Sequence, residues 1–318
     1  MKKILIELPT WLGDAVMTSP AIENLIKYFI SAQITIVGSF VAVEAFKNHP
    51  LVFRTHVLQK NYRALYKTAN FLGSFDYFFS FRGSLRSKVF SLFLSSKNKF
   101  QYNQKNDLLG HQVERYNNFI NNCIKKDYLP GALVLYPDET LSSNSLNPLV
   151  GISPGSSYGS AKRWYPKEFA KVAASLSKTH HIVILGSITE QEIASDIEKK
   201  LIEIGVSNFT NLVGKTSVTE LIKQISTLDL FITGDSGPMH VAASFQVPTV
   251  SIFGPTKSIE TAQWLSKKSI IIKKNLDCQP CMKRVCPLGH HDCMKLIKAN
   301  EVISACSDLI FSSKGKFN

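Results

Sequence analysis

Apolar runs and amphipathic stretches alternate through the first half of the chain. Consecutive apolar residues predict buried strands, and apolar residues three and four positions apart predict helices. The predicted strands are Lys3–Leu8, Gln33–Gly38, His56–Gln59 and Tyr77–Phe81. The predicted helices are Asp14–Phe29, Val41–Lys47, Tyr62–Phe71, Leu85–Leu94 and Val113–Ile124. Because strands alternate with helices, we expect a parallel sheet.

The same alternation starts again after Tyr128–Pro148, a stretch rich in Pro, Asp, Ser and Asn in which we place a domain linker. The strands predicted there are Leu149–Ser153, His181–Gly186, Phe209–Val213, Leu230–Thr233 and Thr249–Phe253. The helices predicted there are Pro166–Ser177, Glu190–Ile204, Val218–Thr227, Pro238–Phe245 and Asn300–Phe311. We therefore predict an α/β protein with two Rossmann-like parallel-sheet domains, residues 1–147 and 148–318, that face a central cleft. The hydrophobic content of 44% is enough for two packed cores.

A turn with two glycines, Gly234-Asp235-Ser236-Gly237-Pro238-Met239-His240, follows one of these strands and precedes a helix. Open α/β sheets bind ligands at such strand ends. The start of a helix offers free N–H groups to an anion such as a pyrophosphate. Asp235 is a candidate acceptor for ligand hydroxyls, and His240 is a candidate hydrogen-bond donor to a phosphate. The alternative is a capped turn that binds no ligand.

Other polar motifs follow the remaining strands. They are Gly13-Asp14, Pro154-Gly155-Ser156-Ser157 with Lys162-Arg163-Trp164 beyond it, Gly186-Ser187-Ile188-Thr189-Glu190, and Phe253-Gly254-Pro255-Thr256. An aspartate at a strand end suits a general base toward a hydroxyl, and small hydroxyl residues with a lysine suit a phosphate. Asp14 and Glu190 are equally placed to cap their helices.

Positive charge is concentrated in the first half of the chain. The net charge is +13, and the segment from Arg54 to Lys105 holds ten Lys and Arg against one acid, Asp76. Tyrosines and phenylalanines are interleaved with these cations, so nucleic acid, an anionic membrane surface and a phosphorylated glycolipid are all candidate partners. A solvated basic face that binds none of them is the alternative. No stretch approaches the about 20 apolar residues of a membrane span, and Glu7, Pro9 and Asp14 interrupt any signal-peptide core. We expect a cytoplasmic protein whose membrane contact, if any, is peripheral.

Two common nucleotide-binding signatures are missing from the sequence. It contains no G-x-G-x-x-G fingerprint and no Walker lysine motif, which argues against dehydrogenases and P-loop enzymes. Phosphate-binding features lie in the second domain, and Asp14, the candidate base, lies in the first. This distribution favours group transfer from a nucleotide-activated donor in the second domain to an acceptor in the first.

Four cysteines cluster near the C-terminus. Cys278, Cys281, Cys286 and Cys293 have the spacing C-x2-C-x4-C-x6-C, with His290 and His291 among them. A zinc site is one interpretation of this spacing. Reduced structural thiols are the other, because disulfides rarely persist in the cytosol.

The motifs, in this order along nearly the whole chain, resemble glycosyltransferase family 9. They are Leu8-Pro9-Thr10-Trp11-Leu12-Gly13-Asp14-Ala15-Val16-Met17, Pro154-Gly155-Ser156, Lys162-Arg163-Trp164, the Gly234–His240 turn and Phe253-Gly254-Pro255-Thr256. This resemblance implies a GT-B fold and an inverting ADP-heptose:lipopolysaccharide heptosyltransferase. The segment from Cys278 to Met294 is most similar to the heptosyltransferase II branch, which adds the second heptose of the inner core. Heptosyltransferase I, another nucleotide-sugar transferase of this fold and a basic nucleic-acid-binding protein remain the alternatives.

The resemblance also implies roles for individual residues. Asp14 would be the general base and Lys162 would stabilise the leaving ADP. Donor binding would involve Ser156, Ser157, Glu190, Asp235, Ser236, Gly237 and His240, with Glu190 at the nucleoside and Asp235 at the heptose hydroxyls. No metal or other cofactor is required by this chemistry.

The acceptor implied by the resemblance is a phosphorylated lipid A-core glycolipid at the cytoplasmic face of the inner membrane. Basic residues of the first domain are candidates for holding it: Lys60, Arg63, Arg82, Arg86 and Arg115. We expect a monomer that works without nucleic acid, and a last helix that packs back on the first domain.

Overall fold

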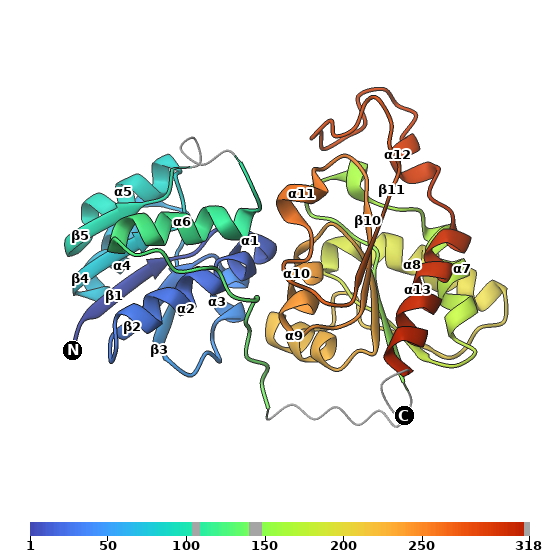
Figure 1. The fold of residues 1–318 in the computed structure, drawn as a ribbon, viewed down its shortest axis with the longest axis horizontal. Coiled ribbons are helices and arrows are strands. Elements are labelled where there is room, and N and C mark those ends of the chain that lie inside the picture. The colour runs from blue at the N-terminus through green and yellow to red at the C-terminus, as the bar shows by residue number, and fades with distance from the viewer. Residues whose placement is uncertain (104–108, 140–147, 315–318) are drawn as a thin grey trace. The chain divides into compact units, whose positions relative to one another are not determined.

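Two compact units, Met1–Pro137 and Asp138–Asn318, make up the chain (Figure 1). The computed structural model describes residues 1–103, 109–139 and 148–314. The predicted domain boundary after residue 147 falls at a segment outside these ranges, and the observed division comes earlier, after Pro137.

A parallel sheet with strand order β3-β2-β1-β4-β5 forms the centre of the first unit. Its strands are β1 (Lys3–Glu7), β2 (Gln33–Gly38), β3 (Val52–Val57), β4 (Ser74–Ser80) and β5 (Ser95–Gln101). Its helices are α1 (Leu12–Met17), α2 (Ser19–Tyr28), α3 (Phe40–Ala45), α4 (Tyr62–Leu72), α5 (Leu85–Phe93) and α6 (Gln112–Ile124). Helix α2 packs with α6, and α4 packs with α5.

The second unit contains a parallel sheet of strand order β11-β10-β9-β6-β7-β8. Its strands are β6 (Leu149–Ser153), β7 (His181–Ile184), β8 (Phe209–Asn211), β9 (Leu230–Gly234), β10 (Thr249–Phe253) and β11 (Ser269–Lys273). Its helices are η2 (Ser160–Lys162), α7 (Pro166–Leu176), η3 (Ile188–Glu190), α8 (Gln191–Glu203), α9 (Val218–Ser226), α10 (Gly237–Ser244), α11 (Ser258–Thr261), α12 (Asp292–Lys295) and α13 (Ala299–Lys314). Figure 1 shows α9 and α10 on one side of this sheet and α7 and α13 on the other.

The central strands are buried on both faces, which explains why they read as continuous apolar runs. Every residue of β6, β9 and β10 is buried. The prediction of two Rossmann-like parallel-sheet domains is confirmed.

The structure corrects three details of the predicted elements. The predicted helix Asp14–Phe29 is two helices, because α1 ends at Met17 and Pro20 sits in the first turn of α2, where its missing N–H costs nothing. Strand β3 begins at Val52, before the predicted start at His56. The edge strands β5 and β11 were not predicted.

The last helix packs within its own unit. Helix α13 contacts α7 and the strands β9, β10 and β11. None of the helices in the described ranges has the length and apolar character needed to span a membrane.

Candidate functional site

Strands β6 and β9 of the second unit are neighbours in the sheet, although β7 and β8 lie between them in the sequence. The chain continues from β6 toward one edge and from β9 toward the other. Ligands of open α/β sheets bind at such a switch point, outside the carboxyl ends of the two strands. The segments that leave these ends are Pro154–Ser157 and Asp235–Ser236, so the sheet brings two predicted donor motifs to one place.

An ion pair joins Asp235 to Lys162, which lies a few residues beyond the Pro154–Ser157 segment. The Lys162 ammonium, from helix η2, lies 2.5 Å from the Asp235 carboxylate and donates a second hydrogen bond of 3.2 Å to the Asp235 carbonyl. The Asp235 carboxylate also accepts hydrogen bonds from Thr256 (2.6 Å) and Thr261 (3.4 Å). Both charged side chains are largely buried. Asp235 thus holds Lys162 and the segment after β10 in fixed positions around the switch point.

The start of helix α10 lies next to this ion pair. Ser236 is the N-cap residue, and its side chain does not cap the helix but lies 3.1 Å from the Thr233 hydroxyl. Pro238 occupies the first turn, and Gly237 is the first helical residue. The first-turn N–H groups therefore receive no side-chain cap, an arrangement that suits an anionic group. His240 is buried one turn into the helix, with 3% of its surface exposed.

The remaining donor candidates lie at the ends of β6 and β7. Ser156 is buried and accepts a 3.3 Å hydrogen bond from the Tyr158 backbone N–H, whereas Ser157 is exposed. Glu190 is 8% exposed and accepts a 2.7 Å hydrogen bond from the Ser187 N–H in a capping box. A Cβ on Gly155 would lie 2.0 Å from the Glu190 carboxyl. Glu190 therefore has the helix-capping role that the sequence left open, and its side chain packs against the backbone of the loop after β6.

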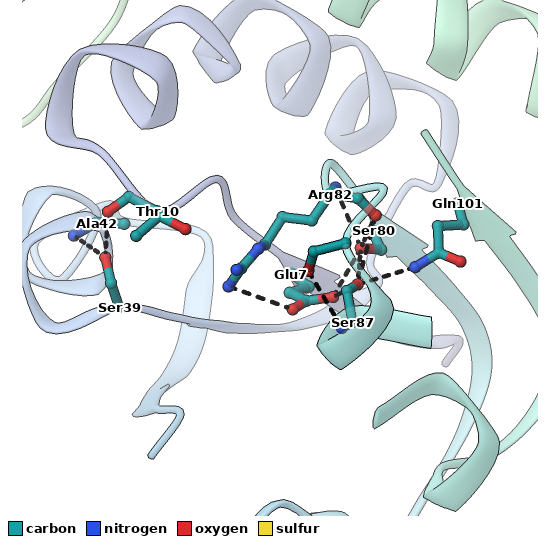
Figure 2. A network of polar contacts seen from close by, with 9 residues as sticks. Glu7, Thr10, Ser39, Ala42, Ser80, Arg82, Ser87 and Gln101 are labelled. Atoms are coloured by element: carbon teal, nitrogen blue, oxygen red, sulfur yellow. Dashed lines mark hydrogen bonds and ion pairs between the residues drawn. The ribbon is translucent and has the colours of Figure 1, made fainter. Parts of the chain in front are cut away.

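In the first unit the corresponding switch point lies between β1 and β4, and a buried carboxylate occupies it (Figure 2). Glu7, the last residue of β1, is 1% exposed. Its carboxylate accepts hydrogen bonds from the hydroxyls of Ser80 (2.6 Å) and Ser87, and it lies 3.7 Å from the Arg82 guanidinium. The amide of Gln101 donates a 2.9 Å hydrogen bond to Ser87. The network therefore ties β1, β4, α5 and β5 together and fixes Arg82.

Burial has the largest effect on the pKa of the Glu7 carboxyl. Desolvation raises the pKa of Glu7 above its ordinary value of 4.5, against the lowering effects of Ser80, Ser87, Arg82 and Arg86. The sequence did not identify this residue. An acid that ends an otherwise apolar strand was the available signal, because a buried carboxylate needs partners.

We predict that the two substitutions Glu7→Leu and Glu7→Gln differ in stability. Both substitutions remove the counter-charge of Arg82, but Glu7→Leu also leaves the hydroxyls of Ser80 and Ser87 without their acceptor and should lower the free energy of unfolding by about 3–5 kcal/mol. Glu7→Gln retains an acceptor for one serine hydroxyl and should cost about 1–3 kcal/mol. Urea unfolding of both variants measures the difference, and equal losses would contradict the network as described.

The stability of the wild-type protein relative to Glu7→Gln has a predicted pH dependence. A raised pKa means that the folded protein holds this proton more tightly than the unfolded chain does. The contribution of Glu7 to stability is therefore fully present below pH 4.5 and is lost as the pH rises toward the higher pKa of the folded state. Glu7→Gln lacks this titration, so the stability of wild type relative to Glu7→Gln should fall over this range. A pH-independent difference would contradict the raised pKa.

Asp14 lies in the first turn of α1 and is half-buried. Helix α1 packs with α6, and the pKa of Tyr116, on α6, is raised first by burial and then by the negative charge of Asp14. The preceding segment is held in position by Ser39, which donates a 2.6 Å hydrogen bond to the Thr10 carbonyl (Figure 2).

The five candidate acceptor residues differ in exposure. Lys60 and Arg63 are exposed, and Arg82 and Arg86 are half-buried. Arg115 is 5% exposed and donates a 3.5 Å hydrogen bond to the Leu109 carbonyl. Arg115 is therefore packed inside the first unit as part of α6, whereas Lys60 and Arg63 lie on its surface.

The cysteine cluster lies in the segment between β11 and α12, residues 274–291, which we call the Cys-rich loop, and in the start of α12. The thiols of Cys278, Cys281, Cys286 and Cys293 line one cavity of about 20 Å³ together with His290 and His291. None of the four forms a disulfide. Burial raises the pKa of the Cys293 thiol to about 11, and the other three thiols add to this effect. No three His, Cys, Asp or Glu side chains in the described part of the chain are arranged to hold a metal ion.

The comparisons with protein families and with individual known proteins both identify heptosyltransferases as similar to this chain. The model of glycosyltransferase family 9 (heptosyltransferase) matches residues 74–291. The chain is 38% identical over 321 aligned residues to lipooligosaccharide heptosyltransferase 2 of Campylobacter jejuni, with 98% of this chain and 99% of that protein covered.

Two solved structures are similar in fold. The structure of Escherichia coli ADP-heptose lps heptosyltransferase II has a TM-score of 0.80 at 21% identity, covering 98% of this chain and 99% of that one. The structure of an E. coli heptosyltransferase with ADP-2-deoxy-2-fluoro heptose has a TM-score of 0.73 at 15% identity, covering 96% and 99%. At these identities the likeness concerns the fold.

Proposed function

The chain belongs to glycosyltransferase family 9 (heptosyltransferase), and we propose that it transfers L-glycero-D-manno-heptose from ADP-heptose to the heptosylated inner core of lipooligosaccharide or lipopolysaccharide. The observation that carries this proposal is the 38% identity to a lipooligosaccharide heptosyltransferase 2 over nearly the whole of both chains. The GT-B-like pair of parallel sheets agrees with that activity.

In this proposal the donor occupies the switch point of the second unit. Lys162 and the uncapped N–H groups at the start of α10 would bind the diphosphate and stabilise the negative charge that develops on the leaving ADP. Ser156, Ser157 and Glu190 lie at the ends of β6 and β7, where they would contact the nucleoside or the phosphates. The donor's heptose hydroxyls would compete with Thr256 and Thr261 for Asp235.

The acceptor would bind to the first unit. Asp14 would take the proton from the acceptor heptose hydroxyl as that oxygen attacks the anomeric carbon of the donor. The bond from the anomeric carbon to the diphosphate oxygen breaks as the new glycosidic bond forms, so the configuration inverts. Positive residues of the same unit, Arg82 and Arg86 among them, would attract a phosphorylated lipid A-core acceptor at the inner-membrane surface. We propose a monomer that binds this surface peripherally.

Acceptor-dependent release of ADP tests the proposed reaction. Purified protein should release ADP from ADP-heptose when mono-heptosylated core acceptor is added, and it should do so slowly without acceptor. Release with the non-heptosylated core alone would identify a first heptosyltransferase instead. Absence of release with both acceptors, in protein that binds ADP, would point to a different acceptor or nucleotide sugar within this fold.

A further inference from the structure

The Cys-rich loop is docked on the segment that carries Lys162. The Ala161 N–H donates a 3.0 Å hydrogen bond to the Arg284 carbonyl, and the His291 ring donates a 2.9 Å hydrogen bond to the Ala161 carbonyl. The Tyr158 hydroxyl donates a 2.7 Å hydrogen bond to the Met282 carbonyl. Two segments more than 100 positions apart in the sequence are thus held together beside the candidate donor site.

A glycine allows this close approach. Gly159 has a φ of 155°, and a Cβ at this position would lie 2.3 Å from the Arg284 carbonyl oxygen. Any other residue would push the Cys-rich loop away from the segment that carries Lys162. The contact is therefore a built feature of the fold, and it fixes where the backbone of Arg284 lies.

Two cations share one aromatic ring at this contact. The Lys162 ammonium lies 4.7 Å from the centre of the Tyr158 ring, and the Arg284 guanidinium lies 5.4 Å from it. Each cation is attracted to the ring, but the two repel each other. Asp235 balances the charge of Lys162, whereas Arg284 is exposed and forms no ion pair with any residue that the structure describes. The charge of Arg284 is available to a ligand.

We propose that Arg284 is a second cation for the diphosphate of the nucleotide donor, acting beside Lys162 and oriented by the ring of Tyr158. This inference rests on the proposed function and assigns part of donor recognition to the Cys-rich loop. A diphosphate carries negative charge on two adjacent phosphates, and a guanidinium binds phosphate oxygens with two parallel hydrogen bonds. The loop would then serve the donor site through Arg284.

Calorimetric titration of ADP and of adenosine into the purified full-length protein tests this inference. Arg284→Gln should weaken ADP binding by about 10-fold or more, the effect of losing a hydrogen bond to a charged group, and should leave adenosine binding unchanged. Lys283→Gln is the matched control, because it removes the same charge from the neighbouring exposed position. It should change ADP affinity by less than about threefold.

Two variants of Tyr158 distinguish the contribution of its ring to ADP binding from that of its hydroxyl. Tyr158→Phe keeps the ring and loses the hydrogen bond to Met282, so it should retain most of the ADP affinity. Tyr158→Leu removes the ring and should weaken ADP binding, with little further loss when it is combined with Arg284→Gln, because both changes affect one interaction.

The possible results are distinguishable from failure of the proposed function. Wild-type protein that binds no ADP would contradict the proposed function itself. ADP binding by wild type with an equal affinity in Arg284→Gln would overturn the role of Arg284 and leave the function standing. Equal weakening of ADP and adenosine would also overturn it, because the loop would then act only by supporting the fold of the site.

Discussion

Replacing Asp14 with asparagine is expected to lower kcat for heptose transfer by about 10²–10⁴-fold while the affinity for ADP stays unchanged. Asparagine has nearly the same size as aspartate but cannot accept the proton of the acceptor hydroxyl. Asp14 lies in the first unit, and the candidate donor residues lie in the second, so the substitution should not change donor binding. Acceptor-dependent ADP release gives kcat, and calorimetric titration gives the ADP affinity.

A second first-turn acid provides the control for Asp14. Glu114 lies in the first turn of α6, where its carboxylate accepts a 2.7 Å hydrogen bond from the His111 N–H in a capping box. Glu114→Gln removes a negative charge from the start of the helix, so it should lower stability by about 0.3–1 kcal/mol and leave kcat unchanged. If Asp14→Asn behaves in the same way, with lower stability and normal kcat, then Asp14 is a helix-stabilising residue and the base must be sought elsewhere.

Burial on both faces made the central strands predictable. The apolar runs at Leu149–Ser153 and Thr249–Phe253 coincide with β6 and β10, all of whose residues are buried. The edge strand β5 lacks this signal. Strand β5 has the sequence Ser-Ser-Lys-Asn-Lys-Phe-Gln, and it is held by its pairing with β4 rather than by apolar burial. Polar edges of this kind reduce unwanted pairing with other sheets, and they are correspondingly hard to recognise from sequence.

The parts of the donor site were predictable, but their contacts were not. The turn at Gly234–His240 and Lys162 were identified separately, because each follows a strand and has residues that suit an anion. Their direct ion pair joins residues 73 positions apart and depends on β9 lying beside β6. Strand order in a sheet does not follow from the order of strands in the sequence, so the pair appears only in the folded structure.

Glu7 illustrates the same limit in the first unit. Its partners Ser80 and Ser87 are ordinary surface-type residues in the sequence, 73 and 80 positions away. Only the adjacency of β1 and β4 makes them hydrogen-bond donors to one buried carboxylate. The local sequence pattern therefore predicted strand β1, but it could not predict the partners that stabilise the acid at the end of this strand.

Replacing Lys162 with methionine is expected to weaken ADP binding by about 100-fold or more and to lower the stability of the protein at the same time. The substitution removes a cation from the diphosphate site, and it also leaves the buried carboxylate of Asp235 without its ion-pair partner. That carboxylate would then repel the diphosphate. Removing one partner of a buried ion pair typically costs about 3–5 kcal/mol, which urea unfolding measures, and calorimetric titration measures the loss of ADP affinity.

The double variant Lys162→Met/Asp235→Asn separates these two effects. Asparagine carries no charge, and its side-chain oxygen can still accept the 2.6 Å hydrogen bond from Thr256, so the double variant should be more stable than Lys162→Met alone. Its ADP affinity should remain low, because no cation has been restored to the diphosphate. Recovery of stability without recovery of binding would show that Lys162 acts on the ligand as well as on Asp235. Wild-type ADP affinity in Lys162→Met would contradict this role, and a double variant no more stable than Lys162→Met would mean that the ion pair contributes little to the fold.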